Sequence, residues 1–193
     1  MMKAIGPLMA DIAGLELTAE DREVLKHPLV GGVILFARNY SDPKQLKALC
    51  TSLLALKRPR LLLAVDHEGG RVQRFRVGFS RVPAMRTLGQ RYVEDRRGAL
   101  AESRRWGRTI GRELAAYGID LCFAPVLDRD TGKSQVIGDR AFASDNDAIV
   151  ALSRAFSAGL KAEGLAATGK HFPGHGTVFA DSHHELPLDR RNM

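Results

Sequence analysis

The sequence is organised as short apolar runs that alternate with segments of helical periodicity. Apolar runs occupy residues 5–11, 30–36, 61–65, 119–126 and, more weakly, 165–168. These runs are nearly all apolar rather than alternating apolar and polar, which is typical of parallel strands covered on both faces. Because helical patterns lie between them, the order predicts an α/β fold with a parallel sheet and right-handed crossovers.

The expected helices carry start signals and apolar stripes. Thr18 to Asp21 resembles a capping box, and Asp42-Pro43 places a cap and a first-turn proline before a second helix. Two further helices are expected near residues 98–117 and 149–160, and we interpret their apolar stripes as core packing. An open doubly wound sheet and a (β/α)8 barrel both fit this order, and in either fold the chemistry should lie in the loops after the strands.

Length and composition indicate one globular domain. The 193 residues, 45% of them hydrophobic, are enough for a single sizeable core. No apolar run approaches the roughly 18 to 20 residues of a transmembrane helix, and the N-terminus lacks a secretory pattern. Cys50 and Cys122 each lie in an apolar segment, so we predict two buried free thiols. These features together predict a cytoplasmic protein without a membrane partner.

The net charge of +7 is concentrated in one stretch, because twelve arginines lie between residues 71 and 112. A nucleic-acid surface is one interpretation, and a basic rim that attracts an anionic small substrate is another. The stretch has little aromatic interleaving and no zinc-finger, RRM or KH signature. We therefore expect a solvated, arginine-rich surface and no nucleic-acid partner.

Residues 170–185 hold four of the six histidines, together with Gly and Pro residues that permit tight turns. One interpretation is a metal site, but the spacing matches no zinc motif and no cysteine joins the cluster. The other interpretation is proton transfer. Asp181 and His183 are two residues apart, so in an extended loop they point the same way and can form an Asp–His pair. This makes His183 a candidate general acid/base.

A second polar segment, residues 65–72, ends a buried strand with Asp66 and Glu68 and continues with Gly69-Gly70, where the chain can turn sharply. A carboxylate at this place can accept hydrogen bonds from substrate hydroxyls. Salt bridges to the nearby arginines are the alternative. The sequence contains no Rossmann fingerprint, no P-loop and no G-x-S-x-G nucleophile elbow.

Taken together, these segments resemble the family 3 glycoside hydrolases, and among them the bacterial cytoplasmic β-N-acetylglucosaminidases of cell-wall recycling. The resemblance covers nearly the whole chain in family order. Its specific part is the run Lys-His-Phe-Pro-Gly-His-Gly at 170–176, followed by Asp-Ser-His at 181–183. The other matching segments are residues 31–36, Asp66 with 68–74, 123–128 and 137–140.

The resemblance implies a (β/α)8 barrel and a retaining mechanism with an aspartate nucleophile and no metal or cofactor. It implies that His183 is the acid/base and Asp181 its partner. The implied substrate is GlcNAc β-linked to an anhydro-muramyl sugar or peptide. The positions implied to bind it are Asp66, Arg74, Arg140, Lys170 and His171. His67 departs from the family, in which glutamine is usual.

The family's nucleophile follows a strand beyond the fifth, whereas the sequence to Met193 contains only five strand signals. Typical barrels take about 250 residues, so we expect residues 1–193 to form a single domain that is the N-terminal part of a barrel of about five βα units. The isolated chain should then be inactive and should self-associate through open strand edges. The alternative is a non-catalytic sugar-binding or assembly module of the same ancestry.

Overall fold

A computed structural model describes residues 5–181 and 184–189. Five strands form a parallel sheet in the order β1-β2-β3-β6-β7, and two more form a separate antiparallel pair. The sheet consists of β1 (Leu8–Ala10), β2 (Val30–Leu35), β3 (Leu62–Val65), β6 (Leu121–Cys122) and β7 (Ala166–Ala167), and the pair of β4 (His67–Gly69) and β5 (Val72–Gln73).

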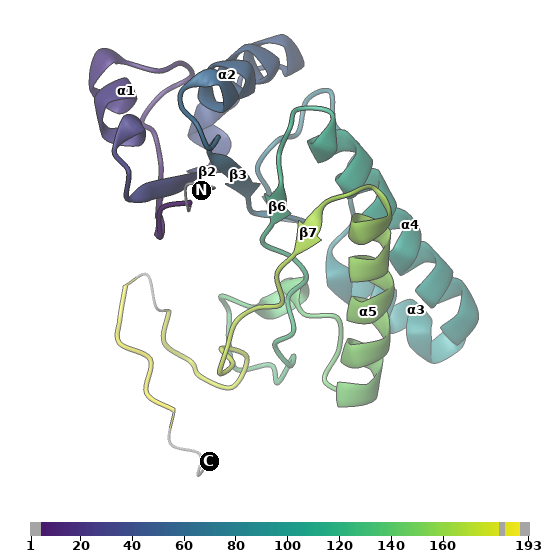
Figure 1. The fold of residues 1–193 in the computed structure, drawn as a ribbon. Coiled ribbons are helices and arrows are strands. Elements are labelled where there is room, and N and C mark those ends of the chain that lie inside the picture. The colour runs from purple at the N-terminus through teal and green to yellow at the C-terminus, as the bar shows by residue number, and fades with distance from the viewer. Residues whose placement is uncertain (1–4, 182–183, 190–193) are drawn as a thin grey trace.

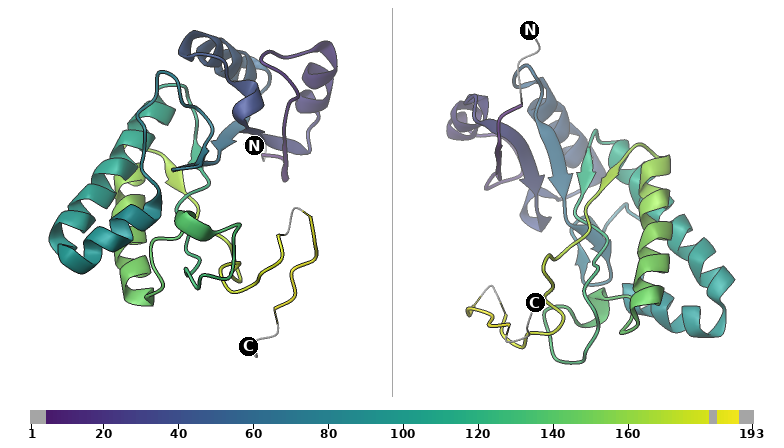
Figure 2. Two further views of the ribbon diagram at one scale, coloured as in Figure 1. Left: turned by 180° about the vertical axis from the view of Figure 1, so that it is seen from behind. Right: turned by 60° about the horizontal axis from the view of Figure 1, so that its bottom comes forward.

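Two groups of helices flank the sheet. Figure 1 shows α1 and α2 beside the first strands, and α3, α4 and α5 together beside the last ones. Their bounds are α1 (Ala19–Lys26), α2 (Pro43–Ala55), α3 (Met85–Glu94), α4 (Arg96–Ala115) and α5 (Asn146–Ala162), with 3-10 turns η1 (Ala37–Asn39) and η2 (Gly138–Arg140). Residues 168–181, which follow β7, lie away from α1 and α2 (Figure 2).

The strand order decides between the two folds that the sequence left open. Neighbouring strands of the five-stranded sheet follow one another in chain order, and all four pairs are parallel. A doubly wound sheet instead reverses its strand order at a switch point. The described residues therefore form an incomplete TIM-barrel-type α/β fold, as predicted.

Both predicted helix starts are confirmed. The Thr18 hydroxyl accepts a hydrogen bond from the backbone N–H of Asp21 (3.0 Å), and the Asp21 carboxylate accepts one from the N–H of Thr18 (2.9 Å), which closes the capping box. Asp42 Oδ1 accepts hydrogen bonds from the N–H groups of Lys44 and Gln45 at 2.9 and 3.0 Å. Caps of this kind provide acceptors for backbone N–H groups that have no partner within the helix.

The region between β3 and β6 differs from the prediction. After β3 the chain forms the β4–β5 hairpin, where Gly69 and Gly70 adopt φ angles of 109° and 54° that residues with a side chain avoid. α3 then follows, which the sequence analysis did not predict. The strand expected over residues 119–126 is regular only at Leu121–Cys122. Pro125 has no N–H with which to extend the ladder.

The helices α4 and α5 cross at very close range. A Cβ atom at Gly107 would lie 2.1 Å from the carbonyl oxygen of Phe156, and one at Gly159 would lie 2.3 Å from that of Arg104. Because these glycines have no side chain, the two backbones pack directly against each other. The stripes that the sequence assigned to the core are buried, with 0% exposure at Ile110, Leu114, Leu152, Phe156 and Leu160.

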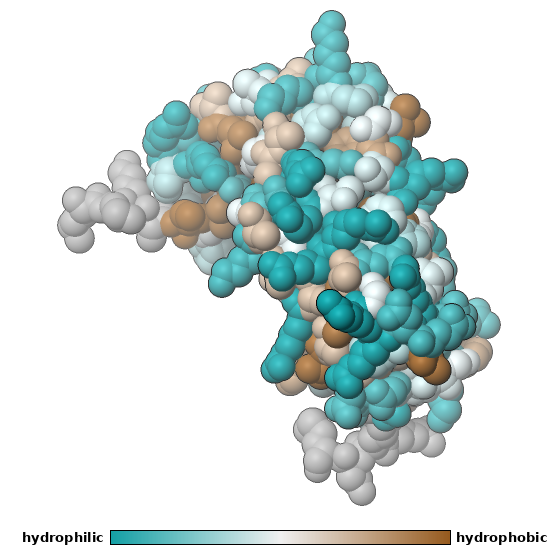
Figure 3. All heavy atoms as spheres, turned by 90° about the vertical axis from the view of Figure 1, so that its right-hand side faces the viewer, coloured by the Kyte–Doolittle hydropathy of each residue, from teal (hydrophilic) through white to brown (hydrophobic). Residues whose placement is uncertain are grey.

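The arginine-rich stretch lies largely on the exposed side of α3 and α4, where it forms ion pairs. Glu102 lies 2.5 Å from Arg91 and 3.3 Å from Arg105, and Glu163 lies 2.9 Å from Arg108. Figure 3 shows this side of the molecule as mostly hydrophilic. These features support the interpretation of a solvated surface, on which solvent screening leaves each ion pair only a small contribution to stability.

Cys50 and Cys122 are buried free thiols, as predicted, and burial raises the pKa of each to about 12. Both thiols are therefore protonated at neutral pH. Within the described part of the chain, no helix has the length and apolar character needed to cross a membrane.

Candidate functional site

The carboxyl ends of β3, β6 and β7 bring three polar segments together. The segments that follow β6 and β7 continue side by side, with a parallel bridge between Val126 and Lys170. This pairing places Asp128 next to His171, whose ring nitrogen Nδ1 lies 2.5 Å from Asp128 Oδ2. Asp66 follows β3 directly and reaches the same place. The site thus lies where a parallel α/β sheet is expected to carry its chemistry.

A cavity of about 510 Å³ opens at this end of the sheet, within the size range of small-molecule sites. Charged residues and histidines make up most of its lining. The lining residues are Asp66, Glu68, Arg71, Val72, Arg74, Phe123, Val136, Ile137, Arg140, Lys170, His171, His175 and Asp181.

Glu68 is the buried centre of the charge network, with an exposed fraction of 2%. Its two carboxylate oxygens accept hydrogen bonds from Arg140 Nε and Nη2, both at 2.8 Å, and Oε1 lies 2.5 Å from Lys170 Nζ. Burial acts to lower the pKa of Arg140, but the hydrogen bonds and the charge of Glu68 outweigh it and raise that pKa. The network therefore holds a fixed cation at the cavity wall.

Asp66 presents a second carboxylate to the cavity. Its Oδ1 accepts a hydrogen bond from Lys170 Nζ at 2.6 Å, and its Oδ2 lies 3.4 Å from Arg74 Nη2. The side chain is 18% exposed, so its oxygens keep room for further donors. The Asp66 carboxylate can accept hydrogen bonds, and Lys170 and Arg74 beside it can donate them. A ligand with neighbouring hydroxyl groups needs both kinds of partner.

Asp128 lies behind the cavity wall, and its side chain is fully buried. Besides its contact with the His171 ring, it accepts hydrogen bonds from the backbone N–H of His171 (3.2 Å) and of His175 (2.5 Å). Burial acts to raise the pKa of Asp128, but these hydrogen bonds outweigh it and lower that pKa. An ionised carboxylate thus anchors the start of the 171–175 segment.

The five residues that the resemblance implies for substrate binding all line this one cavity: Asp66, Arg74, Arg140, Lys170 and His171. Asp181 lines it as well, whereas His183 lies outside the described residues. Their functional roles, including the Asp181–His183 pair, stay predictions.

Two residues of the site, Glu68 and Asp128, were not among the predicted site residues. The sequence contains a pattern that could have identified both residues, because each comes at the end of an apolar strand segment. The sequence analysis weighed Glu68 as a hydrogen-bond acceptor or a salt-bridge partner, and the structure shows the salt bridges to Arg140 and Lys170.

His67 does not reach the cavity. Its side chain is 0% exposed, and its ring centre lies 5.7 Å from those of Phe75 and Phe79. Burial, together with the charges of Arg74 and Arg76, lowers the pKa of His67 to about 3. His67 is therefore a neutral core residue.

The two histidines of the cavity contact each other and a serine hydroxyl. The His171 and His175 rings lie edge to face with their centres 6.4 Å apart, and His175 Nδ1 is 3.3 Å from the Ser134 hydroxyl. Among the residues that the structure describes, no three His, Cys, Asp or Glu side chains gather as a metal-binding group.

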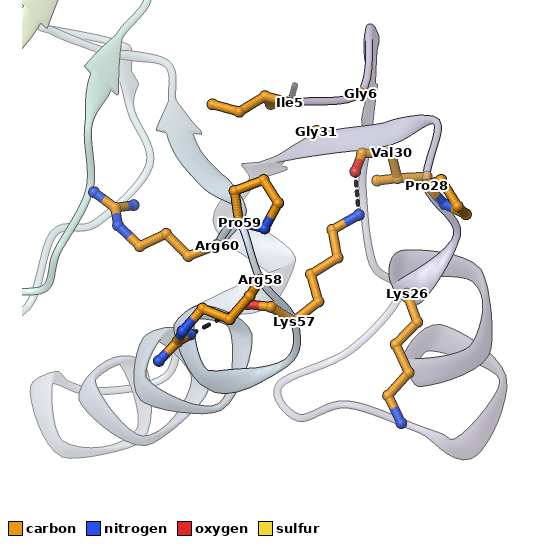
Figure 4. Close-up of a pocket in the computed structure, with 10 residues that line it drawn as sticks. All are labelled: Ile5, Gly6, Lys26, Pro28, Val30, Gly31, Lys57, Arg58, Pro59 and Arg60. Carbon is orange, nitrogen blue, oxygen red and sulfur yellow. Dashed lines mark hydrogen bonds between the residues drawn. The ribbon is translucent and has the colours of Figure 1, made fainter. Parts of the chain in front are cut away.

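A second cavity, of about 210 Å³, lies at the opposite ends of the strands (Figure 4). Lys57 Nζ donates hydrogen bonds to the carbonyl oxygens of His27 and Val30, and Arg60 pairs with Asp120 at 2.6 Å. Among the residues from position 5 onward that the structure describes, its lining contains neither a carboxylate nor a histidine. The cavity at the carboxyl ends of the strands is therefore the candidate site.

Comparison with known proteins gives matches over nearly the whole chain. The model of the glycosyl hydrolase family 3 N terminal domain matches residues 4–193. A curated relative, the Beta-hexosaminidase of Thiobacillus denitrificans, is 57% identical over 189 residues, which are 98% of this chain and 53% of that protein. The chain thus spans about half the length of this relative.

Solved structures show the same partial coverage. NagZ from Neisseria gonorrhoeae in complex with N-trifluoroacetyl-D-glucosamine is 49% identical, with a TM-score of 0.94 over 97% of this chain and 56% of that one. The same protein in complex with a zinc ion gives a TM-score of 0.89 over 90% of this chain and 53% of that one.

Proposed function

Because the chain belongs to glycosyl hydrolase family 3, matching its N-terminal domain, we propose that it supplies the substrate-holding part of a retaining β-N-acetylhexosaminidase. The substrate we propose is GlcNAc β-linked to an anhydro-muramyl sugar or peptide, and the setting is cytoplasmic cell-wall recycling. The observation that carries the proposal is the gathering of five residues in one cavity: Asp66, Arg74, Arg140, Lys170 and His171. The relatives named above support an amino-sugar substrate.

The binding chemistry follows from the charges of the cavity. Asp66 accepts hydrogen bonds from sugar hydroxyls, while Arg74 and Lys170 donate to the oxygens of the same hydroxyls. Arg140 is held in place by Glu68 and cannot turn away from the cavity without breaking two hydrogen bonds. Such pre-set partners fix the pose of the sugar ring.

In the proposed reaction Asp181 orients His183, which protonates the leaving oxygen while an aspartate attacks the anomeric carbon. The glycosidic bond breaks and a glycosyl–enzyme ester forms. Water, deprotonated by His183, then releases the sugar. The nucleophile lies in the part of the family fold that these 193 residues do not contain, and the reaction uses neither metal nor cofactor.

The test uses a protein that joins this chain to the remaining barrel units. His183→Ala should slow the hydrolysis of a poor leaving group by roughly two to four decades, and that of a good leaving group much less. His184→Ala is the matched control and should have little effect. Equal losses for both variants would contradict the Asp–His pair. Sugar binding with no turnover in the joined protein would favour the alternative, a non-catalytic sugar-binding module.

A further inference from the structure

The deepest polar contact of the site is the one between Asp128 and the 171–175 segment. Three nitrogen atoms lie within hydrogen-bond distance of this fully buried carboxylate: His171 Nδ1 at 2.5 Å, the His171 amide at 3.2 Å and the His175 amide at 2.5 Å. We infer that Asp128 is a positioning residue that fixes the tautomer of His171 and so turns its Nε2 into a hydrogen-bond acceptor for a sugar hydroxyl. The sugar part of this inference rests on the proposed function.

The tautomer follows from what each partner can do. An ionised carboxylate only accepts hydrogen bonds, so an imidazole that carries a single hydrogen keeps it on Nδ1, beside Asp128. On the other side of the ring, Arg140 Nη2 lies 3.4 Å from His171 Nε2, and a guanidinium only donates. This contact is long, and a sugar hydroxyl that donates to Nε2 takes its place, because the nitrogen has one lone pair. Both neighbours therefore favour the same form, with Nδ1 protonated and the lone pair on Nε2.

This form has a consequence for recognition. His171 lines the cavity with an exposed fraction of 35%, so part of its ring faces the ligand. A ring nitrogen without hydrogen accepts a hydrogen bond from a hydroxyl, as the Asp66 carboxylate does. In the other tautomer His171 would compete with Arg74 and Lys170 as a donor.

Asp128 acts on the following segment as well. Its Oδ1 accepts the hydrogen bond from the His175 amide, while Oδ2 serves His171. The carboxylate thus holds two points of the segment that leads to Asp181. Replacing one of its oxygens by an NH2 group must break one of these two attachments, since an amide nitrogen cannot accept a hydrogen bond from an N–H.

The experiment reads the imidazole nitrogens of the ligand-free 193-residue chain by ¹⁵N NMR, with His171→Gln to assign the signals. We expect a protonated-type Nδ1 and an unprotonated-type Nε2 in the wild type, and loss of this pattern in Asp128→Ala. In Asp128→Asn, which keeps the shape, either this pattern is lost or the His175 amide exchanges faster with D2O. Asp147→Asn, an exposed carboxylate on α5, is the matched control and should change neither signal.

Titration with N-acetylglucosamine forms the second arm. Loss of a charge-supported hydrogen bond should raise the Kd of Asp128→Ala about tenfold to a hundredfold. A wild type with the hydrogen on Nε2, or an Asn variant that keeps both the tautomer and the amide protection, would overturn the inference. A changed tautomer with unchanged Kd would overturn the acceptor role. If the NMR spectra show the expected tautomer but neither the wild type nor any variant binds N-acetylglucosamine, the proposed function is contradicted and the tautomer assignment stands.

Discussion

At the scale of single residues, Glu68 sets the charge balance of the cavity. Glu68→Gln leaves Arg140 and Lys170, only 10% and 14% exposed, without their shared counter-ion. Removing one partner of such a buried pair costs about 3 kcal/mol or more. Urea unfolding should show this loss, and less than about 1 kcal/mol for Asp139→Asn, whose pair with Arg71 is half exposed. Equal losses would mean that the Glu68 network contributes no more than a surface pair.

His67 should make the fold sensitive to acid. Its folded pKa is about 3 against an ordinary 6.5, chiefly because of burial. Below pH 6.5 the unfolded chain binds a proton that the folded chain does not take up until about pH 3. As the pH is lowered through this window, the free energy of unfolding therefore decreases by about 1.4 kcal/mol per pH unit. At pH 4.5 the loss amounts to about 3 kcal/mol.

The variant His67→Gln removes this titration, so its stability loss between pH 7.5 and pH 4.5 should be smaller than that of the wild type by about 3 kcal/mol. Urea unfolding at the two pH values measures the difference. The same pH dependence in both proteins would show that His67 is protonated in the folded chain.

The residues also show how far the candidate site could be predicted. Asp66 directly follows one apolar run and Lys170 comes two residues after another, so their place at the strand ends could be inferred from local pattern alone. The anchoring role of Asp128 could not, because it depends on the alignment of Val126 with Lys170 across two strands. Neither of the two segments, which lie beyond the ends of β6 and β7, carries a local signal for that register.

At the scale of elements, the α4–α5 crossing depends on its glycines. Gly159→Ala gains up to about 1 kcal/mol in helix propensity, but the new Cβ would lie 2.3 Å from the Arg104 carbonyl oxygen and 2.7 Å from the Arg108 amide nitrogen. We expect a net destabilisation of about 1–3 kcal/mol from this overpacking. In thermal unfolding, Gly14→Ala should be close to neutral, because its nearest neighbour is 4.0 Å away. A more stable Gly159→Ala would contradict the close crossing.

The sequence predicts well those elements that are determined by residues close to them along the chain. The capped starts of α1 and α2 and the apolar strands β2 and β3 fall close to their expected bounds. The β4–β5 hairpin and α3 were missed for a common reason. Gly70 N donates to the carbonyl of Val82, and a Cβ at Gly89 would lie 1.7 Å from the Phe142 carbonyl oxygen, so both elements are shaped by partners distant in sequence.

At the scale of the whole molecule, the sheet has two open edges within the described residues, β1 and β7. On β1, Leu8 and Met9 are 54% and 40% exposed. We expect concentration-dependent self-association of the 193-residue chain in analytical ultracentrifugation. Leu8→Lys should weaken it, while Val93→Lys, on α3 and already 87% exposed, should not. A chain that sediments as a monomer at every concentration would refute this expectation.

The central claim is that the cavity at the carboxyl ends of the strands holds an amino sugar. An NMR titration of N-acetylglucosamine into the 193-residue chain tests it most directly. We predict saturable binding with shifts at the amides around Asp66 and His171, at least about tenfold weaker in Asp66→Asn and unchanged in Asp147→Asn. No saturable binding, or the same affinity in Asp66→Asn as in the wild type, would contradict the account.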